Sequence, residues 1–288
     1  MPYRPSSPYA PRRRPRLTRR GRRAVLTGAL LALAAAVAVP LLLLLPRDRP
    51  TAPPAPPTLL VPEGRRAAQV YESVDRALAL PDGTARRAVT GPAAALGLPA
   101  AAGGNPEGYL FPATYPLPEG TTAEGLLRYM VATAARRFGT PEIAQAARAQ
   151  GLDPYRAVIV ASIAQAEADT PDDMARVARV VHNRLARDMP LQMDSTLNYA
   201  LGRSTVDTTL DDTRIAGPYN TYARTGLPPT PIGNPGDQAM TAALHPSAGD
   251  WLYFVTVAPG DTRFTADYAT HQANVAEFNE RRRQERTP

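Results

Sequence analysis

Cysteine and lysine are both absent from this 288-residue sequence, and histidine occurs only three times. Without cysteine, the chain can form no disulfide and can offer no thiolate to a metal ion. His182, His245 and His271 lie far apart and lack a spacing such as H-E-x-x-H, so we expect no metal site. Glycine-rich phosphate loops and the G-x-S-x-G turn of serine hydrolases are also missing. We therefore expect no cofactor.

Positive charge, which is present, is concentrated at the N-terminus. Residues 1–23 contain nine arginines and no acidic residue, and the whole chain has a net charge of +7. Removing these nine charges leaves about −2 on the remaining 265 residues. A protein that binds nucleic acid carries its basic patch on the folded domain. The charge distribution therefore argues against nucleic acid as a partner.

Residues 24–46 contain no charged side chain. As a helix they would be roughly 34 Å long, enough to cross a bilayer core of about 30 Å. We therefore expect one transmembrane helix. A cleaved signal peptide ending near the small residues 36–38 is the alternative, but the apolar run continues through residues 41–45. The preceding arginines predict that residues 1–23 are cytoplasmic and that the rest of this single-pass cell-membrane protein is outside.

A proline-rich spacer, residues 47–57, leads into a part with both strand and helix signals. Strands are predicted at residues 58–61, 109–111 and 251–257, with residues 264–265 pairing with the last of these. Helices are predicted over residues 70–78, 121–138, 141–150, 154–168, 171–185 and 267–284. Together these signals predict an α+β fold.

Glu167 is the first candidate for a catalytic residue. It follows Ile159 by eight residues and Ile163 by four, so the three side chains share one apolar face of a helix that begins at Asp153-Pro154. Burial and a place in the last helical turn both raise the pKa of a carboxyl group. A carboxyl that stays protonated near neutral pH can serve as the general acid in glycosidic cleavage. The alternative is a structural glutamate bonded to a neighbouring amide.

Three polar segments follow in the sequence, at residues 191–196, 218–222 and 226–232. They combine aromatic rings with Asn, Gln and Asp side chains, which is typical of sugar-binding sites. Ordinary turn chemistry selects the same residue types. A sugar site and a set of structural turns therefore both remain open at this point.

Residues 104–275 contain eight blocks that, in their order, resemble the YceG-like (MltG-type) family of endolytic murein transglycosylases. The blocks are residues 107–115 (EGYLFPATY), 161–167 (ASIAQAE), 183–185 (NRL), 189–194 (MPLQMD), 219–222 (YNTY), 226–236 (GLPPTPIGNPG), 252–255 (LYFV) and 264–271 (FTADYATH). Each block alone is modest, but eight in one order are specific.

Together with the segments identified above, the resemblance implies how the chain is divided. It would consist of an arginine-rich tail (1–23), a transmembrane helix (24–46), a linker (47–57), a reduced LysM-like segment (58–103) and an extracytoplasmic catalytic domain (104–284). The LysM-like segment looks shorter than is usual in the family and begins near residues 61–64.

The resemblance also implies roles for single residues. Glu167 matches the second acid of the family block A-S-I-V-E-K-E-T, which is the catalytic one, whereas Gln165 replaces the first acid. Ser195 replaces a proline expected after Asp194. The implied substrate-binding residues lie in the polar segments named above, and they are Gln192, Asp194, Thr196, Tyr219, Asn220, Thr221 and Tyr222. Asp194 and Gln192 would position the sugar or orient Glu167.

The expected activity is that of a lyase that cuts the bond between N-acetylmuramic acid and N-acetylglucosamine in nascent peptidoglycan and leaves 1,6-anhydro ends. Glycan strands and the membrane are the expected partners, with cell-wall synthases as further candidates. One alternative is an inactive wall-binding scaffold of the same fold. Another is a hydrolase that uses Glu167 and Asp194 as a carboxylate pair, as hydrolytic glycosidases do.

Overall fold

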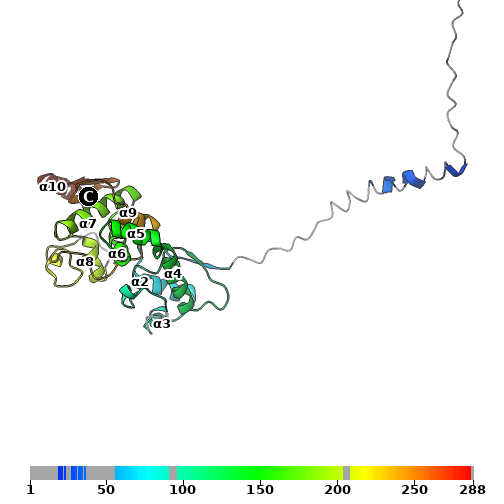
Figure 1. The fold of residues 1–288 in the computed structure, drawn as a ribbon, viewed down its shortest axis with the longest axis horizontal. Coiled ribbons are helices and arrows are strands. Elements are labelled where there is room, and N and C mark those ends of the chain that lie inside the picture. Colours follow the sequence, from blue (N-terminus) through cyan, green and yellow to red (C-terminus); the bar gives the residue numbers. More distant parts are fainter. Residues whose placement is uncertain are drawn as a thin grey trace, which may run out of the picture. The chain divides into compact units, whose positions relative to one another are not determined.

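The structure is a computed structural model that describes residues 19–21, 23, 27–30, 32–34, 36, 56–90, 96–203 and 208–286. The chain divides into two units, residues 1–55 and 56–288. In the first unit, the described residues are helical (Figure 1). Much of the predicted transmembrane segment, residues 24–46, lies outside the described residues. None of the helices in the described part of the chain is long and apolar enough to span a membrane.

The second unit combines helices with two short antiparallel sheets, which confirms the predicted α+β class (Figure 1). Its elements are β1 (Thr58–Leu60), α2 (Ala67–Ala77), α3 (Thr84–Ala88), the 3₁₀ turn η2 (Ala100–Ala102), β2 (Thr114–Pro116), α4 (Ala123–Phe138), α5 (Pro141–Ala149), α6 (Pro154–Glu167), α7 (Pro171–Ala186), α8 (Asp194–Ala200), the 3₁₀ turn η3 (Asp212–Arg214), α9 (Asp237–Leu244), β3 (Tyr253–Ala258), β4 (Asp261–Thr265) and α10 (Tyr268–Arg286).

The first sheet joins β1 to β2 in antiparallel pairing, with Leu59 opposite Tyr115. This pairing crosses the predicted boundary between the segment 58–103 and the segment 104–284. The boundary and the LysM-like character of the first segment stay predictions. On the side facing the core, Tyr115 is almost fully buried.

The prediction of a strand at residues 109–111 is wrong, because these residues form a buried turn. Gly108 has a φ of +86°, and a β-carbon there would lie 2.6 Å from the Pro231 side chain, so only glycine fits. The backbone N–H of Leu110 donates to the side chain of Asn234 at 2.8 Å and not to a neighbouring strand. The turn is thus fixed by residues that lie far away in the sequence.

Helix α6 forms the centre of the core and packs against α7 and α9. Eight consecutive residues, Ala157 to Ala164, are buried, so the helix is enclosed on all sides over this stretch. Both α6 and α7 start as predicted: the side chains of Asp153 and Thr170 accept hydrogen bonds from the third residue on, and proline follows each cap. These local signals place the C-terminus of α6, and with it Glu167, beside the start of α7.

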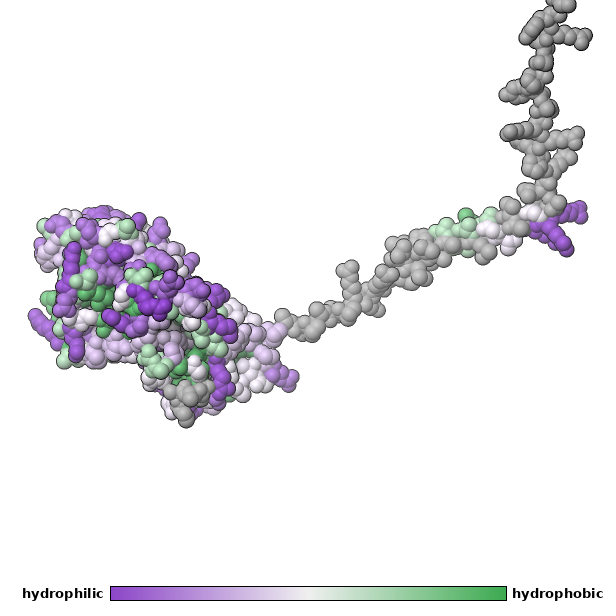
Figure 2. All heavy atoms as spheres, viewed as in Figure 1, coloured by the Kyte–Doolittle hydropathy of each residue, from purple (hydrophilic) through white to green (hydrophobic). Residues whose placement is uncertain are grey.

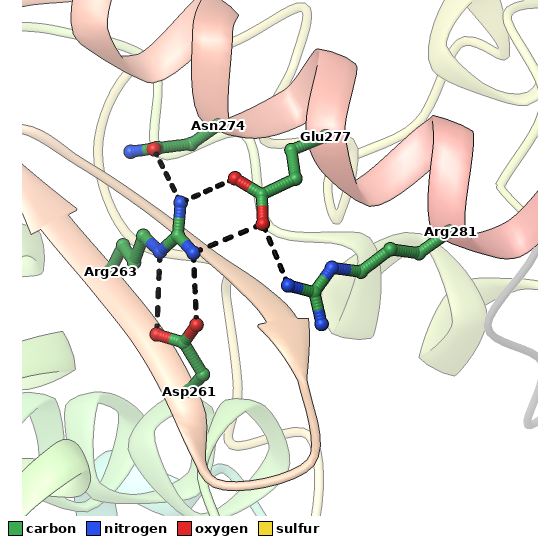
Figure 3. Close-up of polar contacts among 5 residues, drawn as sticks. All are labelled: Asp261, Arg263, Asn274, Glu277 and Arg281. Atoms are coloured by element: carbon green, nitrogen blue, oxygen red, sulfur yellow. Dashed lines mark hydrogen bonds and ion pairs between the residues drawn. The ribbon is translucent and has the colours of Figure 1, made fainter.

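The C-terminal hairpin, β3 and β4, is tied to α10 by a polar network (Figure 3). The Arg263 guanidinium contacts the carboxylates of Asp261 and Glu277 at 3.0 and 2.7 Å, and Arg281 contacts Glu277 at 2.8 Å. The Asn274 side chain accepts a further hydrogen bond from Arg263. Single exposed ion pairs contribute little, but charges that share a network fix relative geometry. The network therefore orients α10 across the hairpin.

Apolar side chains of the second unit are gathered in one continuous core, from Leu59 in β1 to Leu244 in α9. On the face drawn in Figure 2, hydrophilic residues cover most of the surface of this unit. This separation of apolar interior and polar exterior is that of an independently folded domain.

Candidate functional site

Glu167 is the last residue of α6, and its side chain is half-buried. The chain leaves the helix immediately afterwards, because Ala168 has extended backbone angles. Loss of water around the carboxyl raises its pKa, hydrogen bonds from Ser195 lower it, and the negative charge of Asp194 raises it again. The net direction is upward, as the helical spacing predicted. The carboxyl is therefore disposed to hold a proton.

Two hydrogen bonds join this carboxyl to the first turn of α8. The hydroxyl of Ser195 donates to Oε1 of Glu167 at 2.5 Å, and the backbone N–H of Ser195 donates to the same oxygen at 3.3 Å. The second oxygen, Oε2, makes no hydrogen bond to any residue that the structure describes. One side of the carboxyl is thus committed to the protein, and the other is available to a ligand.

A second carboxylate, Asp194, lies beside Glu167 and is bound differently. The Tyr222 hydroxyl donates a hydrogen bond to Oδ1 of Asp194 at 2.6 Å. Burial and this interaction with Asp194 raise the pKa of Tyr222, so the tyrosine remains a proton donor. This hydrogen bond holds the Asp194 carboxyl close to Glu167.

A buried pair of threonines joins α8 to the loop at residues 219–222. The hydroxyls of Thr196 and Thr221 are 2.9 Å apart, and both side chains are buried. Thr221 also accepts the backbone N–H of Met193, and its carbonyl accepts the N–H of Gln192. These bonds fix the segment that carries Asp194 and Ser195 against the segment that carries Tyr222.

Three further predicted residues lie around this framework. Asn220 is buried and donates to the carbonyls of Thr213 and Ile215, so its amide organises the loop. Tyr219 is half-buried, and its hydroxyl lies 2.8 Å from that of Thr230. Gln192 is exposed, but its side chain accepts a hydrogen bond from Arg184.

The structure therefore brings Glu167, Asp194 and Tyr222 together, while Thr196, Asn220 and Thr221 hold their surroundings from within. Substrate contact by any of these residues stays a prediction. Beside the loop lies an open pocket, and the residues that line it are Pro218, Asn220, Thr221, Arg224, Thr225, Gly226, Leu227 and Pro229. Within the described residues, no cluster of His, Asp or Glu could hold a metal ion.

Gln165, the residue that departs from the family block, has a structural partner. Its side-chain oxygen accepts the backbone N–H of Gly236 at 3.1 Å, and Gly236 is the N-cap of α9. The carboxyl of Glu63 lies against the same glycine, where a β-carbon would clash with it. An amide oxygen thus satisfies the first N–H at the start of α9 without adding a second negative charge beside Glu63.

Ser195 and Arg184 contribute to the site, although the sequence did not identify them as functional. The Arg184 guanidinium is buried and donates to the carbonyls of Pro190, Leu191 and Leu252. It therefore fixes the segment that leads into α8. A signal existed in each case: Arg184 lies in one of the family blocks, and Ser195 follows Asp194 at a helix start, where such residues are favoured.

Comparison with known proteins gives one consistent result. A sequence profile of the YceG-like family matches residues 41–277. The chain is 37% identical over 166 residues to a protein of Bacillus subtilis (strain 168) named endolytic murein transglycosylase; the match covers 57% of this chain and 46% of that protein. A protein of the same name from Streptococcus pneumoniae (strain D39) is 34% identical over 177 residues; the match covers 59% of this chain and 32% of that protein.

The chain thus matches less than half the length of these curated relatives. Among solved structures, the crystal structure of a YceG-like protein from Listeria monocytogenes matches with a TM-score of 0.67 and 31% sequence identity. That match covers 76% of each chain, so the likeness extends over most of the folded unit.

Proposed function

Because this chain belongs to the YceG-like family, we propose that it is an endolytic murein transglycosylase, a lyase with Glu167 as its catalytic acid. The observation that carries this proposal is the state of the Glu167 carboxyl. Its pKa is raised, Oε1 is held by Ser195, and Oε2 is free of protein partners among the described residues. Such a group can give a proton to a substrate and take one back.

One acid is sufficient for this reaction. Glu167 donates its proton to the oxygen that bridges N-acetylmuramic acid and N-acetylglucosamine, and the bond from that oxygen to the anomeric carbon breaks. The carboxylate then accepts the proton of the muramyl 6-hydroxyl, whose oxygen bonds to the anomeric carbon. The products are a 1,6-anhydro-muramyl end and a free hydroxyl on the other sugar, and no water is consumed.

Asp194 supports this reaction without acting as the nucleophile. Its Oδ1 is occupied by the Tyr222 hydroxyl, and a carboxylate that accepts such a hydrogen bond is less nucleophilic. Its charge helps to keep Glu167 protonated in the ground state. A hydrolase would instead need Asp194 as its second catalytic carboxyl.

The proposal includes a position in the cell. The uncharged segment 24–46 would anchor the protein in the cell membrane, and the spacer 47–57 would hold the catalytic domain close to the external face of that membrane. Glycan strands of nascent peptidoglycan are the proposed substrate, and their cleavage there would end elongation. Cell-wall synthases are the proposed neighbours.

Mass spectrometry of fragments released from peptidoglycan tests the proposal. The purified full chain is expected to release fragments with anhydro-muramyl ends, and Glu167→Gln is expected to release them at a rate about 10²–10⁴-fold lower. Glu107→Gln is the matched control, because it makes the same change at another buried carboxyl outside the site. Reducing ends would instead identify a hydrolase. A folded wild-type protein that releases nothing would indicate a wall-binding scaffold.

A further inference from the structure

Both hydrogen bonds to the Glu167 carboxyl come from one residue and reach one oxygen. The Ser195 hydroxyl and backbone N–H point at Oε1 from the first turn of α8, at 2.5 and 3.3 Å. In a general acid, the two carboxyl oxygens need different surroundings, because only one of them exchanges the proton with the substrate. An arrangement that saturates one oxygen and leaves the other free provides this difference.

We propose that Ser195 is a positioning residue that holds Oε1 of Glu167, so that the proton passed to and from the glycan resides on Oε2. The proposal rests on the function proposed above and adds a residue to its machinery. Ser195 does not touch the reacting atoms. It acts by fixing the rotation of the carboxyl and by stabilising the carboxylate that forms between the two proton transfers.

The orientation of α8 makes this role possible. Thr196 bonds to the Met193 carbonyl and lies against Thr221, so the first turn of α8 is fixed on its buried side. Ser195, on the adjacent position, is left to face α6. Among the residues that the structure describes, its hydroxyl has no other hydrogen-bond partner and is therefore committed to Glu167.

The charges around the carboxyl determine how the effect can be measured. Of the elements packed against α6, α8 contributes Asp194, whose charge opposes ionisation of Glu167. The loop 219–222 contributes Tyr222, which donates to Asp194 and interacts with Glu167. Among the described residues, α5, α7 and α9 contribute none of the charged groups that shift the Glu167 pKa. Within the described part of the chain, Ser195 supplies the only hydrogen bonds to this carboxyl.

Replacement of Ser195 tests the proposal in a graded series. Ser195→Thr retains the hydroxyl, Ser195→Ala removes it, and Ser195→Pro removes the hydroxyl and the N–H together. Proline is compatible with the second residue of a helix, where its missing N–H has no helical partner. Loss of donors to the charged form raises the pKa of a carboxyl, and a hydrogen bond to a charged group corresponds to about one pH unit.

The first readout is independent of activity. NMR titration of the ¹³C-labelled glutamate carboxyls of the full chain, with Glu167→Gln to assign the signal, should show the pKa of Glu167 rising by about one unit in Ser195→Ala. The rise should be larger in Ser195→Pro and absent in Ser195→Thr. The alkaline limb of transglycosylase activity should move upward by the same amounts, because the reaction begins from the protonated acid.

An unchanged Glu167 titration in Ser195→Ala, or a Thr variant that behaves like the Ala variant, would overturn the proposal. A shifted titration together with a wild-type protein that produces no anhydro ends would have a different meaning. In that case Ser195 would still control the carboxyl, and the proposed function itself would fail.

Discussion

Glu107 and Glu167 are the two glutamates of the described chain whose pKa is raised by burial, and the structure treats them differently. Burial raises the pKa of Glu107 to about 7 and also raises the pKa of Glu167. Glu107 uses both oxygens: Oε1 accepts the backbone N–H of Ala67 at 2.9 Å, and Oε2 accepts the Tyr199 hydroxyl at 3.0 Å. Among the described residues, Glu167 accepts hydrogen bonds only at Oε1, from Ser195.

This difference separates a structural acid from the proposed catalytic acid, although the pKa values of both move in the same direction. Glu107 joins the start of α2 to the turn at residues 106–111 and to Tyr199 in α8. A raised pKa alone would have identified both groups as candidates for general acids. The two groups differ in the second carboxyl oxygen, which accepts a hydrogen bond in Glu107 but not, among the described residues, in Glu167. This difference is visible only in the folded chain.

The largest expected effect contrasts Glu167→Gln with Glu107→Gln. The first change removes the proton donor and should lower the rate of anhydro-end formation about 10²–10⁴-fold. The second change keeps the shape of a group that does not meet substrate, so the rate should stay within a few-fold of wild type. Initial rates on purified glycan strands provide the measurement. A Glu107→Gln variant as inactive as Glu167→Gln would end the distinction between the two acids.

The next prediction concerns stability and pH at Glu107. Its folded pKa of about 7 exceeds that of an unfolded glutamate, so the native state binds more protons over this interval. The stability from this group is full below about pH 4.5 and is lost as pH rises to about 7, which amounts to roughly 3 kcal/mol. Glu107→Gln removes this loss. Denaturant unfolding should therefore show that the free energy of unfolding of the variant rises relative to that of wild type from pH 5 to pH 8.

The exposed Glu124, changed to Gln, is the control for that experiment, because its carboxyl lies on the surface of α4. It should show no comparable gain across the same pH interval. An identical pH dependence in wild type and Glu107→Gln would mean that Glu107 is already ionised at low pH in the folded protein.

Local sequence signals were sufficient for the helices that frame the site. Asp153-Pro154 and Thr170-Pro171 define the starts of α6 and α7, and both helices lie where they were predicted. Glu167 could therefore be placed on a core-facing helix end from spacing alone. The short helices α8 and α9 were not predicted, because seven or eight residues are too few for a clear apolar period.

The partners of the site were beyond the reach of sequence reasoning for a different reason. Ser195 lies 28 residues from Glu167, and only the packing of α8 against α6 brings them together. The same holds for the wrong strand at residues 109–111, where Asn234, 124 residues away, takes the N–H of Leu110. Contacts of this kind leave no periodic trace in the chain.

Two tyrosines sharpen the comparison further, because each donates a hydrogen bond to a carboxylate. Tyr199 donates to Glu107, and Tyr222 donates to Asp194 beside Glu167. Tyr199→Phe should lower the free energy of unfolding by about 1–2 kcal/mol and leave the rate within a few-fold of wild type. Tyr222→Phe should instead lower the rate about tenfold, because Asp194 loses the hydrogen bond that holds its carboxyl in place beside Glu167.

Thermal unfolding and initial rates, measured on both variants, check that Tyr199→Phe mainly lowers stability and that Tyr222→Phe mainly lowers the rate. Each variant is the control for the other, since the chemical change is the same. Equal losses of activity in the two variants would show that Tyr199 also belongs to the reaction site.

The smallest expected effect is at Gln165, which accepts the N–H of Gly236 beside Glu63. In Gln165→Glu, a carboxylate would keep this hydrogen bond and favour the N-terminus of α9, but it would be repelled by Glu63. We expect a loss of about 0.5 kcal/mol at low salt, which salt screens. In the double variant Gln165→Glu/Glu63→Gln, this loss of stability should be absent even at low salt. Activity should stay unchanged, and a tenfold gain would mean that an acid at position 165 takes part in the reaction.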